Sequence, residues 1–282
     1  MPPRFIQRLS DIADEFDALL CDAWGVIHNG VKLFDGVNEA LSAFREKRGP
    51  VVILTNAPRP SSIIPAQLDR IGLSRNAYDA VVTSGDATRA AIESLLPRPI
   101  CKLGPDKDQS LYAGLAVEFA PIDSAGFIVC TGLEDDSRET PADYADFLQR
   151  AAARGLPMVC ANPDIVVRWG DRLVYCAGAL AEAYDKLGGS VVYGGKPHAP
   201  IYDLACNRLD ALAGRALDRR RVLAIGDGVS TDIAGAERNG FRSLFIVGEG
   251  GVHDGAADEA SIAKALDRAG VAADYAAGGL SW

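Results

Sequence analysis

The chain contains 282 residues, of which 48% are hydrophobic and 24% are charged, a composition typical of folded globular proteins. Its formal net charge of −9 argues against extended nucleic-acid binding, because an acidic surface repels phosphate backbones. No apolar run approaches the length of a membrane span, so we expect neither a membrane nor a nucleic-acid partner. The six cysteines include no CxxC pair, which indicates a reducing compartment and predicts a cytoplasmic protein.

The N-terminal part alternates short apolar runs with segments in which apolar residues recur at helical spacing. The apolar runs end at Gly or polar residues, as strands of a buried sheet do, and predict strands at 17–24, 50–58 and 78–86. The periodic segments between and after them predict helices at 37–49, 61–72 and 87–96.

The C-terminal part shows the same alternation. Its elements are expected as helices at 199–209, 211–218 and 231–240 and as strands at 220–228 and 241–250. The middle of the chain also mixes both patterns and is too long to be a loop. Its elements are expected as strands at 126–132 and 156–164 and as helices at 141–155 and 180–189.

Strands that alternate with helices indicate βαβ units and therefore a parallel sheet. We predict an α/β protein with a Rossmann-like parallel-sheet core and a large inserted α/β cap domain. The core is expected to comprise residues 1–86 and 192–282, and the cap residues 87–191. Ligands of open parallel sheets bind at the carboxyl ends of the strands, so the residues that follow each apolar run are the candidate site.

Polar residues follow several of these runs. Asp22 comes directly after the first predicted strand, and Thr55 and Asn56 end the second. Asp227 ends the strand at 220–228, and Asp232 opens the helix after it. These residue types suit phosphoryl transfer. A carboxylate can attack the phosphorus, further carboxylates can hold Mg²⁺, and a hydroxyl can hold phosphoryl oxygens.

A lysine completes this set. Lys196 lies in the segment Gly-Gly-Lys-Pro-His, and the glycines and proline around it indicate a shaped loop. A lysine beside the nucleophile would balance negative charge on the phosphoryl group. The glycines at 225–230 lack the GxGxxG spacing of a dinucleotide site, which makes that a weaker interpretation.

With these residues in place, the sequence resembles the haloacid dehalogenase (HAD) superfamily, and most closely its type IIA, NagD-like branch. Four motifs carry the resemblance in order along the chain: DxWGV at 22–26, TN at 55–56, GKP at 195–197 and GDxxxTD at 226–232. TSG at 83–85 and ANPD at 161–164 also look like that branch. Each motif alone is weak, but four in order at strand ends are specific.

The resemblance implies a phosphatase that acts on a small phosphorylated metabolite, such as a sugar phosphate or nucleotide. It implies that Asp22 is the nucleophile that forms an aspartyl-phosphate, with Lys196 and Thr55 as the other catalytic residues. Asp22, Asp227, Asp232 and the backbone carbonyl of Trp24 would bind Mg²⁺.

The same resemblance implies further contacts. Asn56 and Trp24 would contact the phosphate or substrate, and the cap residues Asn162 and Asp164 are candidate substrate contacts. Asn-Pro-Asp is also a common turn sequence, and Asp232 could equally cap its helix. A homodimer formed through the cap is a further expectation.

Trp24 departs from the family pattern. Most phosphatases of the superfamily carry an Asp there, which protonates the leaving oxygen and then activates water. An indole N–H is a donor only and cannot move protons in both directions. Losing such an acid–base costs about 10²–10⁴-fold in rate, so we expect slow turnover of ordinary monoesters unless another group substitutes.

Three interpretations of Trp24 remain open. The favoured one is an active phosphatase in which His28 or a cap residue replaces the missing acid–base. A second is a hydrolase of an unusual phosphoryl compound, since phosphonate hydrolases of the superfamily also lack this Asp. A third is a catalytically weakened protein that binds a phosphorylated ligand as a sensor.

Overall fold

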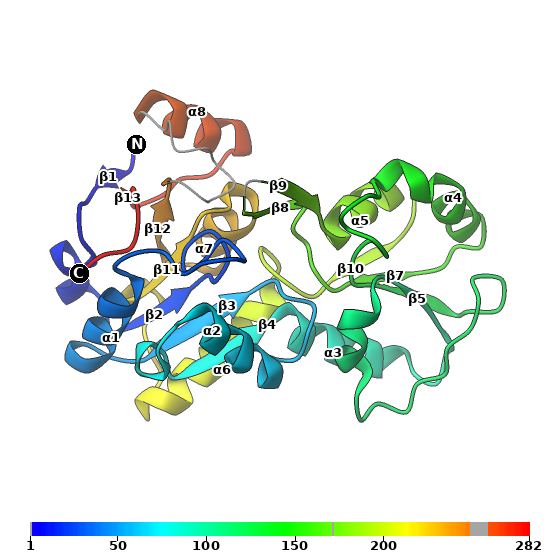
Figure 1. Ribbon diagram of the computed structural model, residues 1–282, viewed down its shortest axis with the longest axis horizontal. Helices are drawn as coiled ribbons and strands as arrows, with labels where there is room; N and C mark the ends of the chain where they lie inside the picture. Colours follow the sequence, from blue (N-terminus) through cyan, green and yellow to red (C-terminus); the bar gives the residue numbers. More distant parts are fainter. Residues whose placement is uncertain (1, 171, 249–258) are drawn as a thin grey trace.

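The computed structural model describes residues 2–170, 172–248 and 259–282. Its largest sheet is parallel throughout and has seven strands in the order β1-β13-β12-β11-β2-β3-β4 (Figure 1). After the edge strand β1, the chain continues at β2 in the sheet interior and then runs outward to β4 on one side and from β11 to β13 on the other, as in Rossmann-like folds. The seven strands span Arg4–Phe5 (β1), Ala18–Cys21 (β2), Val51–Thr55 (β3), Ala80–Thr83 (β4), Val222–Gly226 (β11), Arg242–Ile246 (β12) and Tyr275–Ala277 (β13).

Both faces of this sheet are covered by helices, which explains why its central strands read as continuous apolar runs. Leu19 and Cys21 of β2 face the cluster that contains α1 (Val37–Lys47) and α2 (Ile64–Ile71). Ala18 and Leu20 face the opposite cluster, which packs against the helices of the other layer. Those helices are α6 (Ala199–Ala213) and α7 (Ala234–Asn239), and α8 (Glu259–Ala269) packs at the β12 side.

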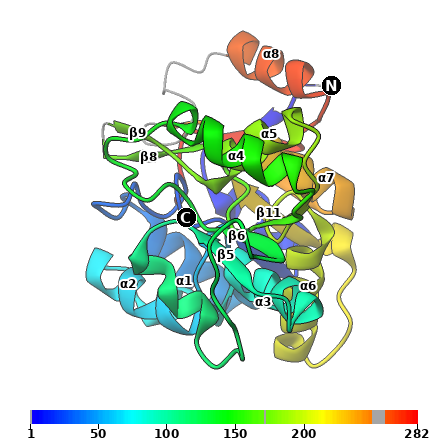
Figure 2. The ribbon, with the colours of Figure 1, turned by 90° about the vertical axis from the view of Figure 1, so that its right-hand side faces the viewer.

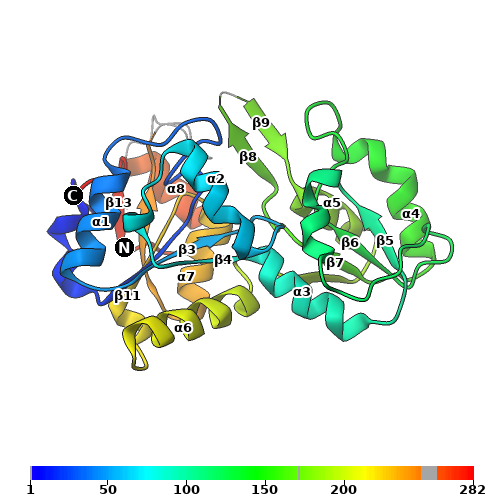
Figure 3. The ribbon, with the colours of Figure 1, turned by 60° about the horizontal axis from the view of Figure 1, so that its bottom comes forward.

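A second sheet is built entirely from the segment between β4 and β11. It is also parallel and has the order β10-β7-β6-β5. Figure 3 shows this part beside the larger sheet, with α3 running from one to the other, and Figure 2 views it end on. Its strands are Ile100–Leu103 (β5), Phe127–Cys130 (β6), Met158–Cys160 (β7) and Val191–Tyr193 (β10), and its helices are Ser84–Leu95 (α3), Ala145–Ala153 (α4) and Ala177–Lys186 (α5). We refer to the part that contains this sheet as the cap.

An antiparallel hairpin extends from the cap toward the larger sheet (Figure 3). It consists of β8 (Val166–Trp169) and β9 (Arg172–Tyr175). Its side chains are exposed or half-buried, unlike those of the two parallel sheets. The sequence patterns above did not predict this hairpin.

The predicted α/β class and the parallel core are confirmed, but several element bounds were wrong. The helix expected from 87 starts at Ser84, because Thr83 caps it and forms a capping box with Asp86. The two helices expected at 199–209 and 211–218 are one helix, which ends at Gly214 in the left-handed conformation. Of the strand expected at 241–250, residues 249 and 250 lie outside the described residues.

The division into core and cap at 86/87 and 191/192 stays a prediction. The strand β10 pairs with β7, so the second sheet extends to Tyr193, beyond the expected return point at 192. Among the described residues, no helix is both long and apolar enough to cross a bilayer. All six cysteines are free, as expected for a chain without a disulfide framework.

Candidate active site

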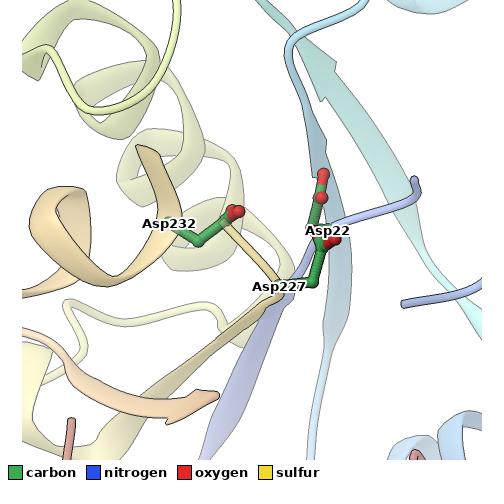
Figure 4. Close-up of side chains that lie close together, drawn as sticks. All are labelled: Asp22, Asp227 and Asp232. Atoms are coloured by element: carbon green, nitrogen blue, oxygen red, sulfur yellow. The ribbon is translucent and has the colours of Figure 1, made fainter. Parts of the chain in front are cut away.

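Three aspartates meet at the carboxyl ends of neighbouring strands (Figure 4). Asp22 follows β2 and Asp227 follows β11, and the Asp22 amide donates to the Ile225 carbonyl at 2.8 Å, which holds the two strand ends together. Asp232 lies in a π-helical turn, Val229–Ile233, that precedes α7. One carboxylate oxygen from each aspartate lies within 4.8 Å of the others, and all three residues are buried.

Lys196 is buried at the centre of this cluster. Its Nζ donates to Oδ1 of Asp22 at 2.6 Å and to Oδ1 of Asp232 at 2.7 Å. The other carboxylate oxygen of Asp232 accepts the backbone N–H of Gly228 at 3.1 Å. The predicted nucleophile and lysine are therefore in direct contact, although 174 residues separate them in the chain.

The cluster concentrates negative charge away from water. Burial raises the pKa of the Asp22 carboxyl well above its ordinary value, and the charges of Asp232 and Asp227 raise it further, although Lys196 opposes them. Burial alone would lower the pKa of Lys196, but the attraction of Asp22 and Asp232 outweighs it and the net pKa is raised. One ammonium faces three carboxylates, so a divalent cation would relieve the remaining repulsion.

Glycine is required where the first motif passes the cluster. Gly25 has φ +83°, and a Cβ built there would lie 2.1 Å from Oδ2 of Asp227. No other residue type fits this position without displacing the Asp227 carboxylate. The close approach explains the glycine of the DxWGV motif in physical terms.

Thr55 and Asn56 lie at the end of β3 and are both buried. The Thr55 hydroxyl accepts the Ala57 N–H at 3.3 Å. The Asn56 side chain is occupied by protein partners: its Oδ1 accepts the Lys196 N–H at 2.8 Å, and its Nδ2 donates to Oδ1 of Asp164 at 2.9 Å. Asn56 therefore joins the lysine loop to the cap.

Trp24 contacts the β8–β9 hairpin of the cap. Its Nε1 donates to the backbone carbonyl of Arg168 at 2.6 Å, and its ring centroid lies 5.6 Å from that of Trp169. Gly170 donates to the Asn29 carbonyl at 3.1 Å, which adds a backbone link between the hairpin and the same loop. The structure thus places Trp24 at a junction between the parts that carry the two sheets.

His28 packs edge-on against the Trp24 ring, with centroids 5.1 Å apart. Its Nδ1 accepts the Gly30 N–H at 3.0 Å, and burial lowers the pKa of the imidazole to about 4. At neutral pH His28 is therefore uncharged and cannot be a ready proton donor, which argues against it as the substitute acid.

The cap residues Asn162 and Asp164 form a local turn that faces the core. The Asn162 side chain accepts the Asp164 N–H at 3.1 Å, the turn that an Asn-Pro-Asp sequence favours. Burial raises the pKa of the Asp164 carboxyl to about 6. The Asn-Pro-Asp sequence therefore forms a turn, and Asp164 also accepts a hydrogen bond from Asn56 of the core.

A cavity of about 440 Å³ lies between the strand ends and the cap. Every expected substrate-contact residue lines it, as does Thr55. Sequence reasoning missed other lining residues: Arg59 and Lys107, with Asp108 and Asp136 as their ion-pair partners, and Trp169 of the hairpin. Arg59 lies close in sequence to the TN motif, and the others belong to the insert. Neither property indicates which side chains point into the cavity.

Comparisons with known proteins identify similar families and structures. The family model described as haloacid dehalogenase-like hydrolase matches residues 19–116, and a related HAD-hydrolase-like model matches residues 193–276. A D-glycerol 3-phosphate phosphatase of Mycobacterium tuberculosis is 25% identical over 246 residues, a match that covers 85% of this chain. The chain spans 65% of the length of that relative.

Solved structures extend the likeness over the whole chain. NagD from Escherichia coli superposes with a TM-score of 0.67 at 20% identity, covering 94% of this chain and 96% of NagD, and therefore shares the fold. A haloacid dehalogenase-like hydrolase from Brucella suis has a TM-score of 0.89 at 43% identity, covering 98% of this chain and 100% of its own. An identity of that size over the full length shows that this chain belongs to the haloacid dehalogenase-like hydrolase family.

Proposed function

We propose that the protein is a Mg²⁺-dependent phosphohydrolase that acts on a small phosphorylated metabolite through an aspartyl-phosphate on Asp22. One observation carries the proposal. The ammonium of Lys196 joins the carboxylates of Asp22 and Asp232 beside Asp227, at strand ends that border a cavity. Structural carboxylates seldom gather in this way unless they bind a cation or react.

In the proposed first step, a carboxylate oxygen of Asp22 attacks phosphorus and the bond to the leaving oxygen breaks. Lys196 keeps that carboxylate oriented and balances charge on the phosphoryl oxygens. The Thr55 hydroxyl lies at the end of the next strand and would donate to one of those oxygens. In the second step water attacks the phosphorus of the aspartyl-phosphate, which releases inorganic phosphate and restores Asp22.

The donor set suits Mg²⁺. Asp22, Asp227 and Asp232 offer only carboxylate oxygens, which this hard cation prefers, and the Trp24 carbonyl is proposed as a further ligand. When bound, Mg²⁺ would neutralise charge on the phosphoryl group and the carboxylates. Asn56 is proposed to act mainly by holding the Lys196 loop, because its side chain is already bonded to that loop and to Asp164.

The cavity volume of about 440 Å³ suits a metabolite rather than a macromolecule. Relatives named as phosphatases, including the D-glycerol 3-phosphate phosphatase, support a phosphate monoester as substrate. We propose that cap residues select the substrate, as lids commonly do. A cytoplasmic location and a homodimer through the cap are further proposals.

The test is phosphate release from a panel of sugar phosphates, nucleotides, glycerol 3-phosphate and 4-nitrophenyl phosphate, with and without Mg²⁺. We expect Mg²⁺-dependent release that Asp22→Asn abolishes, whereas Asp35→Asn, at an exposed acid outside the site, retains it. Saturable binding of panel members without turnover would instead support the sensor interpretation, for which the lack of an acid at Trp24 is the specific argument. Release that survives Asp22→Asn would contradict the proposed mechanism.

A further inference from the structure

Position 24 supplies no proton in this structure. The indole of Trp24 has one polar hydrogen, and it is donated to the Arg168 carbonyl at 2.6 Å. The ring also contacts the rings of His28 and Trp169, with centroids 5.1 and 5.6 Å away, so it cannot turn toward a substrate without breaking these contacts. An acid–base for the reaction must therefore come from elsewhere on the cavity wall.

The wall offers few candidates. His28 is neutral and buried, and its Nδ1 already accepts a backbone N–H. Asp136 pairs with Lys107 at 2.5 Å, and the buried Asp108 lies 3.5 Å from Arg59. Each of these two acids is therefore held by a cation of the cavity wall. Burial raises the pKa of the Asp108 carboxyl, although the charges of Arg59 and Lys107 oppose it.

Asp164 differs from them. Its Oδ1 accepts from the neutral amide of Asn56 at 2.9 Å, and its second carboxylate oxygen has no hydrogen-bond partner within 2–170, 172–248 and 259–282. Asp164 is partly exposed and lines the cavity. The same cavity is lined by Ala23, which follows the proposed nucleophile Asp22 in the chain, and by Thr55, the proposed phosphate-binding residue.

The turn that carries Asp164 is packed directly onto the lysine loop. A Cβ built on Gly195 would lie 2.8 Å from Cδ of Pro163 and 2.3 Å from Oδ1 of Asn56. Asn56 then links Asp164 to the backbone of Lys196, whose Nζ binds Asp22. Asp164 is therefore connected to the nucleophile by three consecutive short contacts.

We propose that Asp164, a residue of the cap, is the general acid–base of this enzyme. Trp24 is then a positioning residue, because it anchors the β8–β9 hairpin that follows Asp164 in the chain. The hairpin strand β8 begins at Val166, so the contact between Trp24 and Arg168 holds the segment next to Asp164 against the core. This inference rests on the proposed function. On this proposal, the acid that position 24 lacks is supplied by the cap.

The proton balance is complete with this assignment. Protonated Asp164 gives its proton to the leaving oxygen as the bond from phosphorus to that oxygen breaks and the bond to Asp22 forms. Its carboxylate then removes a proton from water as the water oxygen bonds to phosphorus and the Asp22 oxygen leaves. Inorganic phosphate departs, and both aspartates regain their starting states.

The surroundings of Asp164 suit both halves of that cycle. Burial raises its pKa to about 6, the nearby charge of Asp232 adds to this, and Lys196 and the Asn56 hydrogen bond oppose it. Two thiols, those of Cys160 and Cys176, also interact with Asp164, and burial raises the pKa of both, so they stay neutral. An acid whose pKa lies near neutrality is protonated often enough to donate and basic enough to accept.

Two probes with different leaving groups test the proposal in the Mg²⁺-loaded full chain. 4-Nitrophenolate departs without protonation, whereas the alkoxide from glycerol 3-phosphate needs a proton. We expect Asp164→Asn to lower kcat for glycerol 3-phosphate by about 100-fold or more, but for 4-nitrophenyl phosphate by less than about tenfold. Asp164→Glu should recover part of the glycerol 3-phosphate activity.

The pH profile gives a second measurement. In the unaltered protein, kcat/KM for glycerol 3-phosphate should fall as the pH rises through about 6, because the acid loses its proton. In Asp164→Asn this decline should disappear. Asp108→Asn, which removes a buried acid from the same cavity wall, should affect both probes equally.

Equal losses on both probes in Asp164→Asn would show a purely structural role and overturn the proposal. Turnover of 4-nitrophenyl phosphate alone by the unaltered protein would overturn it too, since no acid would then serve an alkoxide. Failure of the underlying mechanism is distinguishable, because it would appear as turnover that persists in Asp22→Asn.

Discussion

Lys196 holds together groups that would otherwise repel one another. Its ammonium contacts Asp22 and Asp232 in a buried setting, where removing one partner of an ion pair leaves uncompensated charge. The lysine is thus a structural necessity of the site as well as a proposed catalytic group. Its removal should therefore lower the stability of the folded protein.

We expect Lys196→Met to lower the free energy of unfolding of the metal-free protein by about 3–5 kcal/mol. Saturating Mg²⁺ should restore a large share of this loss, because a divalent cation replaces the missing positive charge. Urea unfolding of both proteins with EDTA and with Mg²⁺ measures this. A loss that is the same under both conditions would contradict a shared role of lysine and cation.

Gly25 offers a test of the metal site that leaves every carboxylate in place. A methyl group there would meet Asp227, so Gly25→Ala should weaken Mg²⁺ binding by about 10–100-fold, as other changes to the supports of metal ligands do. Gly72→Ala is the matched control, because Gly72 also has positive φ but no atom within 4 Å of its built Cβ. Calorimetric titration with Mg²⁺ should separate the two variants; equal affinities would refute the assignment of Asp227.

At this scale the sequence allowed some residues to be predicted and not others. Asp22 and Asp227 directly follow apolar strands, and their positions at strand ends predicted that they belong to the site. The partner of Trp24 is a backbone carbonyl 144 residues away, and no local pattern encodes such a contact. The pairing of Arg59 with Asp108 was missed for the same reason.

The β8–β9 hairpin shows how an element can depend on a distant residue. A two-stranded hairpin is marginally stable alone, and none of the side chains in the strands of this one is fully buried. Trp24 supplies an indole hydrogen bond and a ring contact with Trp169. The hairpin in turn borders the cavity through Val167, Trp169 and Val174, so its docking shapes the proposed substrate site.

Trp24→Phe should loosen this hairpin without removing the aromatic ring. The lost hydrogen bond is worth about 0.5–1.5 kcal/mol, so the Gly170 amide, which is bonded to Asn29, should exchange with deuterium roughly 2–10 times faster. Trp282→Phe is the matched control, because it makes the same change at a distant tryptophan. Unchanged protection of Gly170 in Trp24→Phe would refute the anchoring role.

Element predictions succeeded where burial forces a continuous apolar run and failed where pairing is distant. β2, β3 and β11 lie in the sheet interior and were expected within a few residues. β1 and β13 are only two and three residues long and pair across nearly the whole chain, so their segments show no strand pattern. The hairpin was missed because its strands are only four residues long and none of their side chains is fully buried, so they lack the continuous apolar run of a core strand.

At the scale of the whole molecule, a cavity lies between the parts that carry the two parallel sheets. Contacts across it come from Trp24, Asn56 and Arg59, all of which lie in loops at the strand ends of the larger sheet. The parallel core and the insertion of a second α/β unit were predictable from the alternation of patterns. The relative placement of the two was not, because it depends on these few long-range contacts.

Binding of Mg²⁺ should stabilise the whole fold by mass action. At a concentration 100 times the Kd, the gain is about 2.7 kcal/mol, which corresponds to a rise in Tm of roughly 5–10 °C for a chain of this size. In Asp227→Asn most of this rise in Tm should be lost. Ca²⁺, which prefers more ligands than Mg²⁺, should raise the Tm of the unaltered protein by a different amount. Differential scanning calorimetry measures both; an equal Mg²⁺ response in Asp227→Asn would contradict the site.

The central claim is that phosphate becomes covalently attached to Asp22. Acid quenching during turnover of a ³²P-labelled substrate, followed by peptide mapping, tests it most directly. The account predicts a hydroxylamine-sensitive label on the peptide that contains Asp22, and no label in Asp22→Asn. Sustained turnover in which that peptide carries no phosphate under any quench time would contradict it.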